Sequence, residues 1–420
     1  MEHQNKPTPV QSNVTRDQVT IQRRTPKKKK KAGFKDKMKS FGQSFKAFWQ
    51  RNKSNFFMVL RRTLLVLVTV VLLVVIGLVM VLNLIFNGPS EAACKLLTNS
   101  LHEASATKWV PALFLGKDKA NAILNYVPDN LVELSGTTDT SKVQINTDSM
   151  YDPSNNEWKN YPDGVRIEEV SGKTFNAYVM IIRNPSKVYM ATSSDKFSKD
   201  VPGTRITDQI ETEGAIAAIN AGAFFDNGTS GPEVGSVPEG LVIAGGKVVW
   251  NSGAAPEQGF AGFNKENVLV VAQTMTASRA TELGIRDGCC FGPVLIMNGE
   301  INEKEYNSNS GFNPRTAIGQ RADGAVIFVC IDGRQTSSLG GTYADIIDIM
   351  VEYGAVNACN LDGGSSTVML YRDRYNRYSG TSNDRFGKNN DVVMINNYSL
   401  LQAKPRKMPT FFMVRPAGED

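Results

Sequence analysis

The chain almost lacks histidine: its 420 residues include only His3 and His102, and neither lies beyond residue 102. Imidazole is the base in Ser-His-Asp and Cys-His catalysis and a common ligand of zinc. The sequence therefore excludes these chemistries from the chain beyond residue 102. Any catalysis there must use other groups.

Cysteine is also scarce and is not spaced for metal binding. The five cysteines are Cys94, Cys289, Cys290, Cys330 and Cys359, and they form no CxxC pair. Cys330 and Cys359 each end an apolar run, where cysteine often serves as a small hydrophobic residue. We expect no thiolate zinc site, and we favour buried thiols over a Cys330–Cys359 disulfide.

Acidic residues are rare in the N-terminal part, so the overall net charge of +6 is misleading. The first 62 residues carry 17 Lys and Arg against 3 Asp and Glu, a net charge of +14, which leaves −8 for the remainder. An interaction with nucleic acid would rest entirely on this N-terminal segment. We expect no nucleic-acid partner.

Charge is absent from residues 63–86, which are almost entirely apolar. As a helix this segment spans roughly 36 Å, enough to cross the hydrocarbon core of a bilayer. Arg61 and Arg62 precede it, and the positive-inside rule places the basic side in the cytoplasm. The sequence predicts a single-pass protein of the cell membrane with its C-terminal part extracellular. A cleaved signal peptide, or a lipoprotein site ending at Cys94, is the less favoured alternative.

The basic tail, residues 1–62, has two interpretations. The simpler one is a topology signal made of solvated charge. The other is an amphipathic helix that binds anionic lipid on the inner leaflet, because aromatic residues at helical spacing interleave with lysines. These aromatic residues are Phe34, Phe41, Phe45, Phe48 and Trp49.

The remaining chain divides into two parts of different residue composition. Residues 87–164 read as a helical stalk, including a short helix over 117–124, followed by a polar linker; we expect little chemistry there. Residues 165–420 contain short apolar runs broken by Gly, Asn and Pro. We predict an α/β fold of mixed α+β sheet architecture for this domain, behind one N-terminal transmembrane helix.

The stretch 313–371 is the most informative. An apolar strand ends before Asp332, a helix follows Thr342, and a second strand ends before Asp362. A strand–helix–strand crossover predicts two adjacent parallel strands, whose carboxyl ends share one edge of the sheet, where ligands bind. The same two Asp-Gly pairs are also common in plain turns. We expect both carboxylates at one site, with Gly363 and Gly364 allowing close approach to a ligand.

Further polar residues stand beside apolar runs of the same domain. Asn220 and Asp226 enclose a short loop, Glu239 precedes a hairpin, and Arg315 precedes a strand. Each alone is equally typical of a loop cap or a surface residue. Their number in one domain favours a site.

Taken together, these segments resemble the phosphodiester glycosidase family, relatives of the enzyme that removes N-acetylglucosamine from a phosphodiester, over roughly residues 165–416. The motifs are INAGAFFD, VPEGLVI, FGPVLIMNG, NPRTAIG, CIDGRQ and NACNLDGGSSTVML, in that order. Many family members carry three glycines in the last motif, whereas this chain has two followed by Ser365 and Ser366, as expected of bacterial membrane-anchored members.

The resemblance implies hydrolysis of a sugar-1-phosphodiester at the glycosidic carbon. Glycosidases use paired carboxylates, and a phosphodiester leaving group needs charge neutralisation by arginine more than protonation. The expected catalytic carboxylates are Asp362 with Glu239 or Asp332. Expected substrate-binding residues are Arg315, Arg334, Asn220, Asp226, Gly363, Gly364 and Ser365.

We expect no cofactor and no metal. Asp226, Asp332 and Asp362 are oxygen donors suited to Ca²⁺ or Mg²⁺, which keeps a divalent cation as a lesser alternative. The expected partners are a sugar-phosphate polymer or glycan substrate, such as wall polymer or exopolysaccharide, and membrane lipid. Two other functions compete with the enzyme: a surface module of the same fold that binds glycan without cutting it, and a scaffold whose tail organises inner-leaflet partners.

Overall fold

The computed structural model describes residues 34–416, except 105, 127–130, 132–133, 146–156, 226–233, 254–258, 309, 379–384, 388, 390 and 398–403. The chain divides into two compact units, Met1–Leu78 and Val79–Asp420. Predictions that concern Asp226 and residues 1–33 therefore lie outside the described residues.

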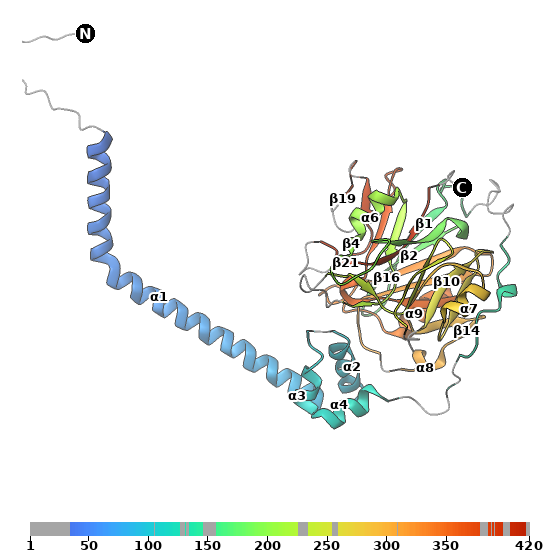
Figure 1. Cartoon of the computed structure of the whole chain (residues 1–420). Helices are drawn as coiled ribbons and strands as arrows, with labels where there is room; N and C mark the ends of the chain where they lie inside the picture. The colour runs from blue at the N-terminus through green and yellow to red at the C-terminus, as the bar shows by residue number, and fades with distance from the viewer. Residues whose placement is uncertain are drawn as a thin grey trace, which may run out of the picture. The chain divides into compact units, whose positions relative to one another are not determined.

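The N-terminal helix α1 runs without interruption over Phe34–Asn87 (Figure 1). It contains the predicted span 63–86 and is long and apolar enough to cross a membrane. Its first part contains the aromatic residues, so that segment is helical, as their spacing predicted; Phe41, Phe45 and Phe48 are exposed. The structure thus supplies one candidate membrane span, while its orientation stays a prediction.

Three short helices follow: α2 (Glu91–His102), α3 (Val110–Leu115) and α4 (Lys117–Leu124). The predicted helix over 117–124 is confirmed. Ser90 begins α2 as its N-cap, because its side chain accepts a hydrogen bond from the Ala93 N–H. Stacking of Phe86 on Phe114, with ring centres 5.2 Å apart, packs the end of α1 against α3.

The C-terminal domain is built on three main sheets (Figure 1). The strand order of the seven-stranded sheet is β1 (Val165–Ser171), β2 (Asn176–Ile182), β16 (Val326–Ile331), β15 (Arg315–Arg321), β17 (Ala355–Leu361), β13 (Val294–Met297) and β14 (Glu300–Ile301). Helix α9 (Tyr343–Glu352) packs against one face of this sheet, burying Ile346, Ile347 and Met350. The opposite face joins the other two sheets in a common core that includes Phe328.

The other two sheets complete the domain. The five-stranded sheet runs β11 (Leu269–Ala272), β10 (Phe260–Asn264), β12 (Ile285–Cys290), β8 (Leu241–Ala244) and β9 (Lys247–Asn251). The six-stranded sheet runs β19 (Arg385–Phe386), β20 (Val392–Met394), β18 (Met369–Arg372), β5 (Ala217–Asn220), β22 (Thr410–Val414) and β3 (Val188–Thr192). The described residues also form two two-stranded pairs, β4 (Thr204–Arg205) with β21 (Lys407–Met408) and β6 (Phe224–Phe225) with β7 (Val237–Pro238). Short helices complete this list, namely α6 (Ile206–Glu213), α7 (Ala277–Glu282), α8 (Glu303–Tyr306) and the 3-10 helices Thr140–Lys142, Pro185–Lys187 and Gly364–Ser366. The mixed α+β architecture is therefore as predicted.

One detail of the predicted topology is wrong. Strands β16 and β17 are not neighbours, because β15 lies between them and pairs antiparallel with both. Two strands that are each antiparallel to a third run in the same direction, so β16 and β17 are parallel without being adjacent. The error arose because the strand that begins at Arg315 enters the sheet between them, which no local pattern reveals.

Two local predictions hold. Thr342 and Asp345 form the capping box at the start of α9, and Gly354 follows its C-terminal end with φ +78°. Cys330 and Cys359 are buried free thiols, and so are Cys94, Cys289 and Cys290. Burial raises the pKa of the Cys290 thiol to about 11, so it stays protonated and packs as an apolar side chain.

Candidate active site

Three candidate residues lie at one edge of the seven-stranded sheet. Arg315 begins β15 and pairs with Ile331, the last residue of β16, while Thr316 pairs with Leu361, the last residue of β17. Asp332 and Asp362 therefore leave the sheet on either side of β15, at the end where Arg315 stands. The shared edge that the sequence predicted is present, with the arginine's strand between the two acidic ones.

The turn that carries Asp362 is held by the backbone of its surroundings. The Asp362 N–H donates to the carbonyl of Ala221 (3.0 Å), and the Gly364 N–H donates to that of Pro314 (2.9 Å). A Cβ at Gly363 would lie 2.7 Å from the Pro314 carbonyl oxygen, so only glycine fits there. Gly364 has φ +60°, a left-handed conformation that favours glycine.

Asn220 lies beneath this turn and is fully buried. Its amide nitrogen donates to the backbone carbonyl of Asp362. Its Oδ1 accepts from the Thr316 hydroxyl (2.9 Å) and the Val368 N–H (3.1 Å). Both ends of the Asn220 amide thus bind the protein itself and hold the Asp362 turn in place. The geometry therefore gives Asn220 a positioning role.

A cavity of about 310 Å³ opens over the Asp362 turn. Its charged lining residues are Asp362, Glu103, Arg315, Arg334 and Arg406, and its other lining residues are Phe291, Asn313, Pro314, Tyr343, Asn360, Gly363, Gly364 and Ser365. One carboxylate on a turn thus shares a cavity with three arginines and a second carboxylate.

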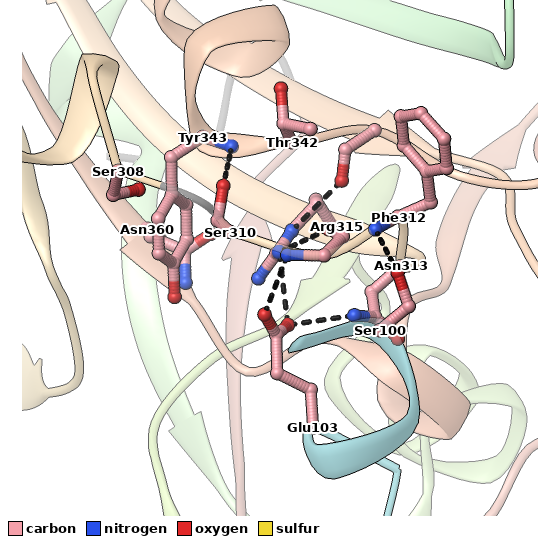
Figure 2. Close-up of polar contacts among 12 residues, drawn as sticks. Ser100, Glu103, Ser308, Ser310, Phe312, Asn313, Arg315, Thr342, Tyr343 and Asn360 are labelled. Carbon is pink, nitrogen blue, oxygen red and sulfur yellow. Dashed lines mark hydrogen bonds and ion pairs between the residues drawn. The ribbon is translucent and has the colours of Figure 1, made fainter. Parts of the chain in front are cut away.

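Arg315 lines this cavity and is only 5% exposed. Its Nε donates to the Gly341 carbonyl (3.2 Å), and its Nη2 donates to the Gly311 carbonyl (2.8 Å). The same Nη2 forms an ion pair with Glu103 at 2.9 Å (Figure 2). The guanidinium lies 4.2 Å from the ring centre of Tyr343, so its contacts fix its orientation closely.

Arg334 and Arg406 line the cavity from other loops. The Arg334 Nη2 donates to Asn313 Oδ1 (2.9 Å), and the Arg406 Nη1 donates to the Ser365 hydroxyl (3.2 Å). Loss of hydration lowers the pKa of Arg334, as does the charge of Arg315, whereas Glu103 and Asp362 raise it. The four charges of this part of the cavity therefore act on one another.

Asp332 lies in a smaller adjoining cavity of about 40 Å³, which shares Pro314, Arg334, Gly364 and Ser365 with the larger one. The carboxylate is 1% exposed and accepts a hydrogen bond from Asn397 Nδ2 at 3.0 Å. Burial raises the pKa of Asp332 to about 7, although its hydrogen bonds oppose the shift. A carboxyl group that titrates near neutral pH is suited to general acid or base catalysis.

Glu239 occupies a different position from the other carboxylates. It follows β7, its N–H donates to the carbonyl of Ala223, and its charge raises the pKa of the Cys290 thiol. It is a lining residue of neither cavity described above. Asp226 belongs to the undescribed segment 226–233.

The sequence missed two charged residues of the larger cavity, Glu103 and Arg406. Arg406 lies beside the basic residues Lys404 and Lys407 in a segment without a motif. Glu103 belongs to the stalk, for which we expected little chemistry; that expectation is wrong in this respect, because the end of α2 docks on the loop that precedes β15. Nothing in the local sequence marks this long-range contact.

The docking of α2 on that loop is close. A Cβ at Gly311 would lie 2.3 Å from the backbone nitrogen of Ser100, so glycine permits the approach. The Phe312 N–H donates to the Ser100 hydroxyl (2.9 Å), and the Gly311 N–H donates to the Glu103 carboxylate (3.0 Å). Figure 2 shows the Glu103 carboxylate turned toward Arg315 from the end of α2.

In the part of the chain that the structure describes, no group of three or more His, Cys, Asp or Glu side chains is arranged to hold a metal ion. The charge distribution of the larger cavity is instead typical of a site for an acidic ligand, in which arginines hold the anion through directed hydrogen bonds.

Comparison with known proteins agrees with this class of site. Residues 213–415 match the family model of phosphodiester glycosidases. This match supports the assignment of this part of the chain to the phosphodiester glycosidase family, which the order of motifs predicted.

Individual relatives are distant. A SPbeta prophage-derived uncharacterized protein, YomE of Bacillus subtilis strain 168, is 33% identical over 95 residues, which are 22% of this chain and 15% of that protein. The auto-inhibited catalytic domain of zebrafish N-acetylglucosamine-1-phosphodiester alpha-N-acetylglucosaminidase has a TM-score of 0.44 at 18% identity, over 60% of this chain and 82% of that one. A hypothetical protein from Synechocystis has a TM-score of 0.41 at 16% identity, over 60% of this chain and 61% of that one.

Proposed function

We propose that this protein is a membrane-anchored hydrolase that cleaves the glycosidic bond of sugar-1-phosphodiesters. The helix α1 anchors it, the basic tail lies in the cytoplasm, and the domain acts outside the cell on wall polymer or surface polysaccharide. The observation that carries the proposal is the placement of Asp362 in one cavity with Arg315, Arg334 and Arg406.

In this mechanism Asp362 faces the anomeric carbon, as the nucleophile or as the base that activates water. The phosphodiester is the leaving group. The guanidinium groups of Arg334 and Arg406 neutralise its charge, and Arg315 adds a third positive charge to the same cavity. Water supplies the hydroxyl group on the sugar and the proton on the released phosphate.

Asp332 is the better second carboxylate. It lies in the adjoining cavity beside Arg334 and Ser365, and its pKa of about 7 leaves it partly protonated at neutral pH. It can therefore give a proton to the departing oxygen and take one back. Since a phosphodiester is a weak base, the step needs little acid, and a domain without histidine is sufficient.

The test is Asp362→Asn in the full chain, assayed against a panel of sugar-1-phosphodiesters for free reducing sugar. We expect loss of hydrolysis with an almost unchanged melting curve, because the Asp362 side chain is half-buried at the cavity and the substitution keeps its size. Asp323→Asn is the matched control, since Asp323 is an exposed carboxylate on another loop. Near-normal turnover by Asp362→Asn would refute the assignment.

A different result would identify a glycan-binding module: the parent protein releases no sugar, and both the parent and Asp362→Asn bind the polymer. The two functions therefore give different results in the same assay.

A further inference from the structure

The charged side chains of the larger cavity come from two regions of the chain. Arg315, Arg334, Asp362 and Arg406 belong to the family domain, whereas Glu103 comes from the end of α2 in the stalk. The stalk therefore contributes one wall of the cavity, and it leaves about 310 Å³ of space in front of that wall.

Glu103 is built into this wall by three partners. It forms the ion pair with Arg315 at 2.9 Å, and it accepts hydrogen bonds from the Gly311 N–H (3.0 Å) and from Asn313 Nδ2 (2.7 Å). Asn313 in turn accepts from Arg334 at 2.9 Å. The carboxylate is thus joined directly to one arginine of the cavity and through Asn313 to a second.

The formal charges of the lining residues give a simple sum. Three arginines supply +3, and Glu103 and Asp362 supply −2, which leaves +1. A phosphodiester carries one negative charge, because both bridging oxygens are esterified. A phosphomonoester carries about −1.5 to −2 at neutral pH. The cavity with Glu103 therefore matches a diester, and without Glu103 its net charge of +2 would match a monoester.

We propose that Glu103 is a specificity-determining residue, which sets the charge of the cavity so that it accepts a phosphodiester in preference to a phosphomonoester. The proposal rests on the proposed function and deepens it. It also has a consequence for turnover, since cleavage releases a phosphomonoester, which the cavity would hold less well than the substrate.

The experiment measures binding of two probes without sugar, dimethyl phosphate (one charge) and methyl phosphate (two charges), to the full chain in detergent micelles. Phosphorus NMR titration at about pH 8 keeps methyl phosphate above its second pKa of about 6. For Glu103→Gln we expect the affinity for methyl phosphate to rise about tenfold relative to that for dimethyl phosphate, which equals about 1.4 kcal/mol.

Matched variants separate charge from docking. Glu91→Gln removes an exposed glutamate of the same helix, and Glu103→Asp keeps the charge; both should leave the ratio of affinities unchanged. Ser100→Ala weakens the docking of α2 without a change of charge, and should alter both affinities alike. Ser365→Asp adds a charge at the cavity wall and should shift the ratio the opposite way; it keeps the test decisive if Glu103→Gln does not fold.

An unchanged ratio in Glu103→Gln would overturn the proposal. Equal tightening of both probes would do so too, because it would mean that Glu103 merely competes for the anion site. A parent protein that binds neither probe would show that the cavity is not an anion site. The two proposals can also fail separately. If Glu103→Gln shifts the ratio of affinities but the parent hydrolyses no sugar-1-phosphodiester, the charge selectivity is supported and the proposed function is rejected.

Discussion

Replacing Asp332 by Asn should change how the stability of the protein depends on pH. Burial raises the pKa of Asp332 from its ordinary value of 3.8 to about 7, so the folded state holds this proton where the unfolded chain has lost it. The free energy of unfolding therefore falls as the pH rises from about 4 to 7. At about 1.4 kcal/mol per pKa unit, a shift of roughly three units costs about 4 kcal/mol above pH 7.

The assay is urea unfolding in detergent, followed by tryptophan fluorescence, at about pH 5 and about pH 8.5. The titration of Asp332 should make the parent less stable at the higher pH by about 3 kcal/mol, because part of the full effect is already lost at pH 5. Asp332→Asn resembles the protonated acid, and its Oδ1 can still accept from Asn397, so it should lose most of this dependence. Asp323→Asn removes an exposed carboxylate and should behave as the parent.

The reasoning is refuted if Asp332→Asn and the parent show the same pH dependence. That result would mean that hydrogen bonds to the Asp332 carboxylate offset its burial, and it would remove the argument for Asp332 as a proton donor near neutral pH.

Two further changes test the support of the Asp362 turn. Asn220→Ala leaves buried groups of Thr316, Val368 and Asp362 without their partner, so we expect a loss of about 3 kcal/mol in urea unfolding and a lower kcat; an unchanged midpoint would contradict the positioning role. Gly363→Ala brings a Cβ to 2.7 Å from the Pro314 carbonyl oxygen, so the turn must move, and hydrolysis should fall at least tenfold with far-UV circular dichroism unchanged; normal turnover would show that the turn tolerates displacement.

The comparison of sequence with structure is clearest at the sheet edge. The alternation of apolar runs with Asp-Gly turns was sufficient to place Asp332 and Asp362 at strand ends, because burial of a strand and the turn after it are local properties. Which strands lie next to each other in the sheet is not a local property. Strand β15 enters between β16 and β17, and the pairing of three strands depends on which of them fit together in the sheet.

The roles of the polar residues follow the same division. The motif around Arg315 pointed to the site, but only the fold shows that its guanidinium is already held by two carbonyl groups, Tyr343 and Glu103. Asn220 was expected to meet the ligand, and the structure directs its side chain to the backbone of the Asp362 turn. A hydrogen-bond partner cannot be read from residue type alone.

By itself the sequence determined the long apolar helix, the mixed domain behind it, the family of that domain and the exclusion of imidazole chemistry there. These conclusions depend on composition, on the spacing of apolar residues and on short motifs, which are local properties of the sequence and do not depend on how the chain folds. Only the tertiary structure decided that Glu103 and Arg406 line the cavity. Glu103 contacts Arg315, which lies about 210 residues further along the chain, and Arg406 contacts Ser365, which lies about 40 residues before it. Such contacts exist only once the whole domain has packed.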